Sequence, residues 1–193
     1  MDVQNIFEKG KVWTLSNFLS AIRIVLGFLL YCLVLQHSTA LAILTGLVAI
    51  ITDFGDGYFA RKRNEISELG KILDPIGDKV TVILGSIGLY QTYGMPLVIV
   101  IIIIARDVLI LLGSIVLMTK FQQVIASRMP GKIAVTIIAL LLLAYLLEIH
   151  PAQKPLIILA IIAIFISFTY YMLRFFRLLR EKLSEGEMYN GPK

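Results

Sequence analysis

The chain has 193 residues, of which 58% are hydrophobic and 16% are charged, and its formal net charge is +5. Soluble domains are about 45–50% apolar and about 25% charged. This composition therefore excludes a disordered tail, a disulfide scaffold and a nucleic-acid-binding module. It predicts an all-α integral membrane protein that has membrane lipids, and no nucleic acid, as partners.

Residues 1–14 mix apolar and charged side chains, which is typical of a short interfacial helix with Trp13 at headgroup level or of a frayed terminus. Apolar runs follow, each close to the roughly 20 residues that a membrane-spanning helix needs. The six predicted transmembrane helices are 18–36, 39–61, 75–93, 95–119, 131–149 and 155–176. We expect turns at Gly94-Met95-Pro96 and at His150-Pro151. The expected organisation is one membrane domain over residues 1–193, with a polar tail at 181–193.

Lysine and arginine are distributed very unequally between the two predicted faces of the membrane. An even number of spans puts both termini on one side, and the opposite side has only Lys154. The basic residues on the side of the termini are Lys9, Lys11, Arg61, Lys62, Arg63, Lys71, Lys120, Arg128, Lys132, Arg174, Arg177, Arg180 and Lys182. Cytoplasmic loops are enriched in Lys and Arg, so this side is predicted to be cytoplasmic.

Four aspartates lie at the predicted cytoplasmic ends of the second and third spans. Asp53 and Asp56 are three residues apart, and Asp74 and Asp78 are four apart, so each pair shares a helix face. A short loop joins the two spans, which predicts antiparallel neighbouring helices. The four carboxylates are therefore expected at the same mouth of the helix bundle.

Carboxylates at membrane depth are costly, at about 2.5–3.5 kcal/mol each on insertion scales, and four together repel one another. Arg61 and Lys79 can offset only part of this charge. Hard divalent cations such as Mg²⁺ and Mn²⁺ prefer carboxylate oxygens and accept phosphate oxygens as further ligands. The pattern thus predicts a one- or two-metal site for a phosphate ester. The alternative is a set of solvated helix-end charges paired with arginines.

Glycines are interleaved with the aspartates. Gly57 lies one turn from Asp53, and Gly70 lies one turn before Asp74. A glycine at such a position lets a planar or phosphate group approach the backbone. The alternative, close packing between helices in lipid, applies best to Gly55 and Gly77.

The motif as a whole resembles the signature of the CDP-alcohol phosphotransferase (phosphatidyltransferase) family, without a gap or substitution. Its eight positions span 26 residues and are Asp53, Asp56, Gly57, Ala60, Arg61, Gly70, Asp74 and Asp78. The resemblance implies transfer of a phosphatidyl group from CDP-diacylglycerol to an alcohol, with release of CMP, by an enzyme that is usually a homodimer.

The resemblance also implies residue roles. Two Mg²⁺ or Mn²⁺ ions would be held by Asp53, Asp56, Asp74 and Asp78, and Asp78 would be the general base on the acceptor hydroxyl. The residues that would bind the cytidine diphosphate are Asn17, Asp53, Gly57, Ala60, Arg61 and Gly70. Arg23 follows Asn17 in the same segment, and a cation that snorkels to the membrane surface is at least as good an interpretation of it.

The acceptor alcohol is less well defined. An anionic acceptor needs a basic pocket, for which the candidates are Arg106, Arg128, Lys132 and Arg174. Arg106-Asp107 is an intramembrane charge pair, which is either functional or an ion pair that stabilises the fourth span.

Gly131-Lys132 resembles phosphatidylglycerophosphate synthases, although Asp107 and Ser114 depart from the Arg-Glu and second Arg of that subfamily, and its threonine after Gly-Lys is missing or shifted. Ala105-Arg106-Asp107 is similar to eukaryotic-type cardiolipin synthases, which use phosphatidylglycerol. The resemblance implies glycerol 3-phosphate as the common acceptor of short six-span members of the family, so we expect it first by a narrow margin, with phosphatidylglycerol, inositol phosphate or serine as alternatives.

Two other classes of protein use clustered carboxylates in membranes. Intramembrane prenyltransferases have two aspartate-rich motifs far apart in a longer chain, whereas here all four aspartates fall within 26 residues. A divalent cation carrier usually places its site near the bilayer midplane between matched repeats. Neither pattern is found in this sequence, which favours the phosphatidyltransferase.

Overall fold

The computed structural model describes the backbone of residues 15–63, 70–121 and 129–189, and within it the side chains of 18–52, 76–77, 79–113, 129–178 and 180. The described backbone forms six helices, which confirms the all-α prediction for this part of the chain. They are α1 (Leu15–Leu35), α2 (Thr39–Arg63), α3 (Gly70–Tyr93), α4 (Leu97–Phe121), α5 (Met129–Leu146) and α6 (His150–Tyr189). The predicted interfacial segment 1–14 lies outside the described residues.

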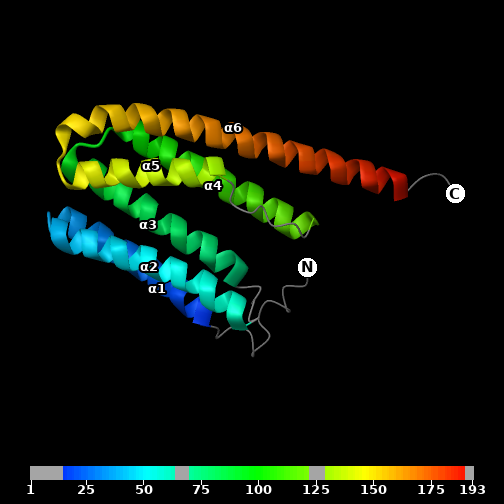
Figure 1. The fold of residues 1–193 in the computed structure, drawn as a ribbon, viewed down its shortest axis with the longest axis horizontal. Helices are drawn as coiled ribbons and strands as arrows, with labels where there is room; N and C mark the ends of the chain where they lie inside the picture. The colour runs from blue at the N-terminus through cyan, green and yellow to red at the C-terminus, as the bar shows by residue number, and fades with distance from the viewer. Residues whose placement is uncertain (1–14, 64–69, 122–128, 190–193) are drawn as a thin grey trace.

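Successive helices run in opposite directions along one bundle (Figure 1). In the view of Figure 1, α1, α2 and α3 form the lower part of the bundle and α4, α5 and α6 the upper part. α1 packs against both α3 and α2, and α5 packs against α6. α3 also contacts α4 and α5, so it connects the two halves. The end of α2 and the start of α3 therefore lie at the same end of the bundle.

Three helices begin earlier in the sequence than the predicted spans, although the apolar stretch of α1 begins at Phe18, as predicted. α1 begins at Leu15, α3 at Gly70 and α6 at His150, so Pro75 and Pro155 lie inside helices. A proline removes one backbone hydrogen bond, and membrane helices tolerate that loss because neighbouring groups compensate for it. As a result, Asn17 belongs to the first turn of α1 instead of preceding the helix.

The turn predicted at Gly94-Met95-Pro96 is confirmed, whereas the turn predicted at His150-Pro151 lies just before these residues, because His150 is already the first residue of α6. Gly94 has a φ of 67°, and α4 begins only after Pro96. α5 ends at Leu146, before Glu148, which has a φ of 53°. A single residue with left-handed backbone ends a helix, which explains why α3 ends before Gly94 and α5 ends before Glu148.

The turn between α1 and α2 is attached to the end of α3. The ring of His37 lies 5.2 Å from the ring of Tyr93, measured between centroids. The hydroxyls of Thr39 and Tyr93 are 3.2 Å apart and share a hydrogen bond. α2 and α3 thus meet directly at the end of the bundle opposite the aspartate motif.

Small residues allow α1 and α3 to pack very closely. A Cβ at Gly77 would lie 3.2 Å from the backbone oxygen of Ser20, and a Cβ at Gly27 would lie 3.2 Å from the Cα of Thr81. The packing interpretation of Gly77 is therefore confirmed. Gly55 lies outside the described side chains.

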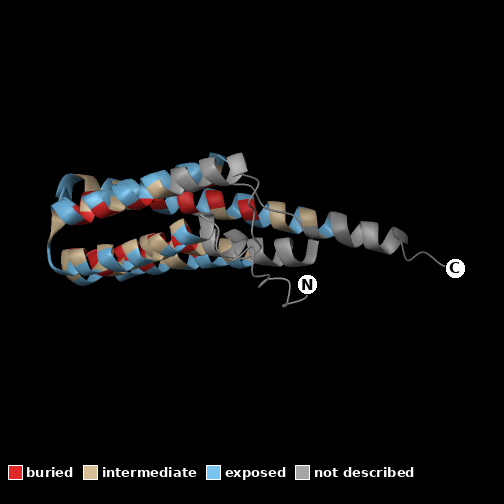
Figure 2. Cartoon of the chain, turned by 90° about the horizontal axis from the view of Figure 1, so that it is seen from below, coloured by how far each residue is buried: buried red, intermediate tan, exposed pale blue. Residues whose placement is uncertain are grey.

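The apolar core includes the fully buried residues Ile103 of α4, Leu141 of α5 and Ala160 of α6. Figure 2 shows buried residues on the inward faces of the helices and exposed residues on the outer faces. Many exposed side chains are large and apolar, and Phe165 is 70% exposed. Such a surface is stable in lipid but not in water.

Three described helical stretches are long and apolar enough to cross a membrane: Phe18–Leu35, Met129–Leu146 and His150–Leu178. A fourth apolar stretch, Thr39–Thr52, is shorter. Together with the apolar outer surface, these stretches indicate an integral membrane protein, as predicted.

Candidate active site

The four aspartate positions lie on two antiparallel helices at one end of the bundle. Asp53 and Asp56 belong to the last turns of α2, and Asp74 and Asp78 belong to the first turns of α3. The helical backbone confirms the helix assignment on which the shared-face argument rests. The side chains of these four residues lie outside the described set.

A group of charged and polar side chains joins α3, α4 and α6. Lys79 Nζ lies 3.1 Å from Asp107 Oδ1, and Arg106 Nη1 donates to the same oxygen at 2.6 Å. Arg106 Nη2 donates to Ser167 Oγ at 2.9 Å. We call Lys79, Arg106, Asp107 and Ser167 the charge cluster. These contacts connect Arg106 and Asp107 to α3 and α6, so the pair stabilises more than α4 alone.

The charge cluster is well shielded from solvent. Arg106 is 4% exposed, Asp107 is 2% exposed and Ser167 is fully buried, whereas the side chain of Lys79 is 23% exposed. Two cations share one carboxylate, so the cluster has an excess of positive charge. Arg106 Nε is buried and has no hydrogen-bond partner among the described residues. An unsatisfied buried donor costs about 1–3 kcal/mol, which favours a nearby anionic group.

Arg23 adds a further buried cation on α1. It is 2% exposed, so it does not reach the membrane surface as a snorkelling side chain would. A Cβ at Gly77 would lie 3.6 Å from the Cβ of Arg23. The α3 backbone at Gly77 is therefore adjacent to a residue of α1 that bears a buried cation.

Residues 13–171 match the sequence profile described as CDP-alcohol phosphatidyltransferase. The chain belongs to the CDP-alcohol phosphatidyltransferase family. The match includes the aspartate motif and the charge cluster, and it confirms the resemblance carried by the motif.

Several family members resemble this phosphatidyltransferase in sequence. The CDP-diacylglycerol–glycerol-3-phosphate 3-phosphatidyltransferase of Aquifex aeolicus is 29% identical over 84% of this chain and 96% of its own. The enzyme of the same name from Bacillus subtilis is 39% identical over 45% of each chain. The cardiolipin synthase (CMP-forming) of Rattus norvegicus is 37% identical over 51% of this chain and 33% of its own. The chain thus spans nearly all of the first relative but less than half of the other two.

The donor set of this phosphatidyltransferase suits a hard divalent cation. Among the described side chains, no group of three His, Cys, Asp or Glu residues could hold a metal ion. The aspartate motif lies outside that set, and its backbone brings four carboxylate-bearing positions to one end of α2 and α3. Carboxylates are the ligands that Mg²⁺ and Mn²⁺ prefer, so the motif residues fit the metals implied for the family.

The predicted acceptor residues of the phosphatidyltransferase are not all brought together. Arg106 belongs to the charge cluster, whereas Lys132 is exposed on α5 and Arg174 is half-buried on α6. Arg128 lies outside the described residues. Among the three candidates that the structure describes, Arg106 is thus the one with contacts in the charge cluster.

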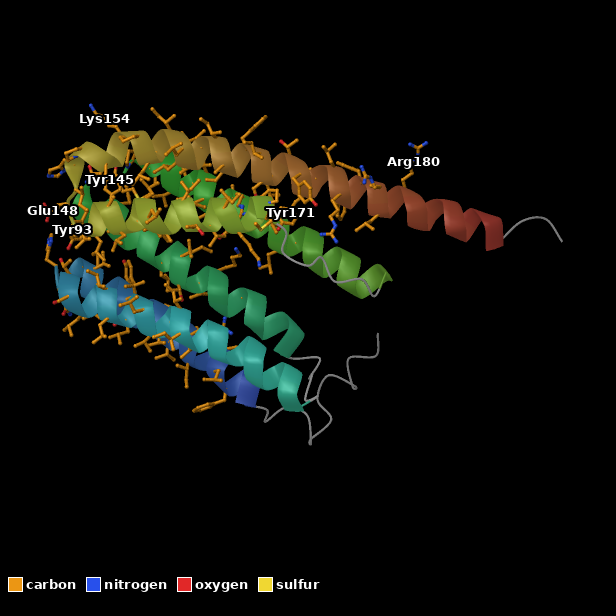
Figure 3. The ribbon with its side chains drawn as sticks, in the orientation of Figure 1. Tyr93, Tyr145, Glu148, Lys154, Tyr171 and Arg180 are labelled. Atoms are coloured by element: carbon orange, nitrogen blue, oxygen red, sulfur yellow. The ribbon has the colours of Figure 1, made fainter. Side chains whose placement is uncertain are left out.

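Two residues of the phosphatidyltransferase that contact a predicted site residue or its neighbour were not predicted from the sequence. Ser167 lies in a long apolar run that gives no sign of a polar contact. Tyr171 on α6 lies against Gly131 on α5, where a Cβ would clash with the tyrosine ring (Figure 3). Gly131 is a feature of the sequence that indicates this packing, because close approach of another helix requires a small residue.

Proposed function

We propose that the chain transfers the phosphatidyl group of CDP-diacylglycerol to glycerol 3-phosphate, forming phosphatidylglycerophosphate and releasing CMP. The observation that carries this proposal is that the helix positions of the four motif aspartates lie at one end of α2 and α3 in a member of this family. The full-length relative from Aquifex aeolicus, which is named for glycerol 3-phosphate, supports the acceptor.

We assign the metal ligands to Asp53, Asp56, Asp74 and Asp78, which would hold two Mg²⁺ or Mn²⁺ ions. When bound, these ions neutralise the diphosphate and stabilise the leaving CMP. We assign the cytidine diphosphate pocket to Asn17, Asp53, Gly57, Ala60, Arg61 and Gly70. The first turn of α1, where Asn17 lies, belongs to a helix that packs against both α2 and α3, and this supports the assignment.

Asp78 has the role of general base in this proposal. An alcohol is a weak nucleophile at neutral pH, so a carboxylate must accept its proton as the oxygen attacks phosphorus. The motif contains no Ser, Cys or His that could form a covalent intermediate. We therefore propose direct displacement of CMP by the acceptor oxygen.

Arg106 is the acceptor-binding residue that the geometry supports best. It is buried, it is positively charged, and its Nε has no partner among the described residues. An arginine favours the phosphate of glycerol 3-phosphate through charge-assisted hydrogen bonds. Lys132, Arg128 and Arg174 remain candidates for the outer part of the same pocket.

One observation favours phosphatidylglycerol as a second candidate acceptor. Asp107 already pairs with Arg106 at 2.6 Å, so the positive charge available to a ligand is reduced. A phosphodiester has one negative charge, whereas a phosphate monoester approaches two at neutral pH. The partial likeness to cardiolipin synthases agrees with this alternative.

We also propose six membrane spans, a homodimer and a cytoplasmic active site. The end of the bundle with the aspartates includes the basic helix ends at Arg61, Lys71 and Lys132. Lys154 lies at the opposite end, near Glu148 (Figure 3). The unequal distribution of positive charge supports a cytoplasmic location for the aspartate end.

The test incubates the purified protein with CDP-diacylglycerol, Mg²⁺ and each acceptor in turn, and identifies the lipid product by mass. We expect phosphatidylglycerophosphate and CMP with glycerol 3-phosphate, and loss of both products after chelation. Cardiolipin formed only from phosphatidylglycerol would select the second acceptor. Divalent cation flux in vesicles without CMP release would favour a carrier instead.

A further inference from the structure

The turn of α3 that includes Asp78 is attached to other helices on both sides. Gly77 packs against α1, with its hypothetical Cβ 3.2 Å from the oxygen of Ser20. Lys79 binds Asp107 of α4 at 3.1 Å. Because successive helix residues are about 100° apart, these contacts lie on nearly opposite sides of α3, and the backbone of Asp78 lies between them.

The Lys79 contact leads to a third helix. Asp107 also binds Arg106, and Arg106 donates to the fully buried Ser167 of α6. In a low-dielectric interior such a connected network resists displacement of any one member. The position of the Lys79 turn is therefore determined by α4 and α6 as well as by α1.

We infer that Lys79 is a positioning residue for the reaction, which acts through Asp107 to hold the α3 turn with Asp78 in register with the opposing α2 aspartates. This inference rests on the proposed function of Asp78. It gives Lys79 a role different from that of Arg106, because Lys79 would affect the position of the base and metal ligands instead of acceptor binding.

Lys79→Met is the cleanest variant. Methionine keeps most of the length of the side chain, and the buried Arg106–Asp107 pair stays intact and neutral. We expect kcat to fall about tenfold, because partners that orient metal ligands typically contribute about 10–100-fold to activity or metal affinity. The KM for the acceptor should stay within about twofold, since Lys79 does not contact the acceptor in this proposal.

Direct Mn²⁺ binding, measured by electron paramagnetic resonance in detergent, distinguishes a positioning effect of Lys79 from an effect of its charge alone. Removing a cation near the aspartates would by itself tighten Mn²⁺ binding. Loss of positioning should instead weaken it, and we expect the Kd to rise about tenfold. Tighter Mn²⁺ binding in Lys79→Met would overturn the positioning role.

Two further variants complete the test. Lys79→Arg keeps the charge and should restore most of kcat and of Mn²⁺ affinity. Lys154→Met removes an exposed lysine at the opposite end of the bundle and should behave like the wild type. Wild-type kcat in Lys79→Met, or a raised acceptor KM alone, would contradict the inference.

If Lys79→Met does not fold, Asp107→Glu moves the same carboxylate by one methylene and has the same readouts, with wild-type values contradicting the inference. A wild-type protein that releases no CMP under any condition would contradict the proposed function itself. The two failures are therefore distinguishable.

Discussion

Tyr171 on α6 occupies the space in which a side chain of Gly131 on α5 would stand. A Cβ at Gly131 would lie about 3.0 Å from two carbons of the tyrosine ring and still closer to its hydroxyl. Tyr171 is 9% exposed, so its ring has little room to move. This contact fixes the start of α5, where Lys132 follows Gly131, against the last buried turns of α6.

Gly131→Ala should therefore destabilise the protein. Forcing a methyl group into a packed interface typically costs about 1–3 kcal/mol, which should appear as a lower midpoint of thermal unfolding in detergent. In a Tyr171→Ala background the space is open, and the same substitution should have a much smaller effect. Equal effects in both backgrounds would show that the tyrosine ring is not the cause.

The α1–α3 contact offers a second stability test. A Cβ at Gly27 would lie 3.2 Å from the Cα of Thr81 and 3.3 Å from its backbone nitrogen. Backbone atoms cannot rotate away, so Gly27→Ala should push the two helices apart and cost about 1–3 kcal/mol.

Gly46 is the matched control for Gly27, because nothing lies within 4 Å of its hypothetical Cβ. Gly46→Ala should be neutral or should stabilise α2 by up to about 1 kcal/mol. Comparable destabilisation at Gly46 and Gly27 would mean that both values reflect the helix backbone and not the contact.

Asp78→Asn tests the proposed general base. The amide has nearly the shape of the carboxylate but does not accept the proton, so turnover should fall by about 10²–10⁴-fold. Binding of CMP should survive, which equilibrium binding can measure. Glu148→Gln makes the same chemical change at an exposed turn and should leave turnover unchanged. Full activity of Asp78→Asn would remove the assigned base.

Arg106→Gln tests acceptor binding. Asp107 keeps Lys79 as a partner, so no buried carboxylate is left alone. The loss of a charged hydrogen bond, worth about 1.5–3 kcal/mol, should raise the acceptor KM by about 10–150-fold and change the KM for CDP-diacylglycerol far less.

Ser167→Ala is the smaller perturbation of the same arginine, because it removes only the hydrogen bond to Nη2. We expect an effect on the acceptor KM well below that of Arg106→Gln, since the guanidinium charge and its hydrogen bond to Asp107 are kept. An unchanged acceptor KM in Arg106→Gln would exclude this residue from the pocket.

Hydrophobic runs, turn residues and charge spacing were sufficient to predict most of the helices, the turn at Gly94 and the family. These features are local, because a glycine or an apolar run acts on its own segment of chain. Helix starts were less predictable. Pro75 and Pro155 suggested boundaries, but each lies inside a helix, since packing between helices compensates for the lost hydrogen bond.

The sequence by itself determined that four aspartates share helix faces at one end of a membrane bundle, because helical periodicity follows directly from spacing. Only the tertiary structure decided that Lys79, Arg106, Asp107 and Ser167 meet, and that Arg23 is buried beside Gly77. Ser167 lies 61 residues from Arg106 in the chain. Such a contact depends on how α3, α4 and α6 pack, which no local pattern in the sequence specifies.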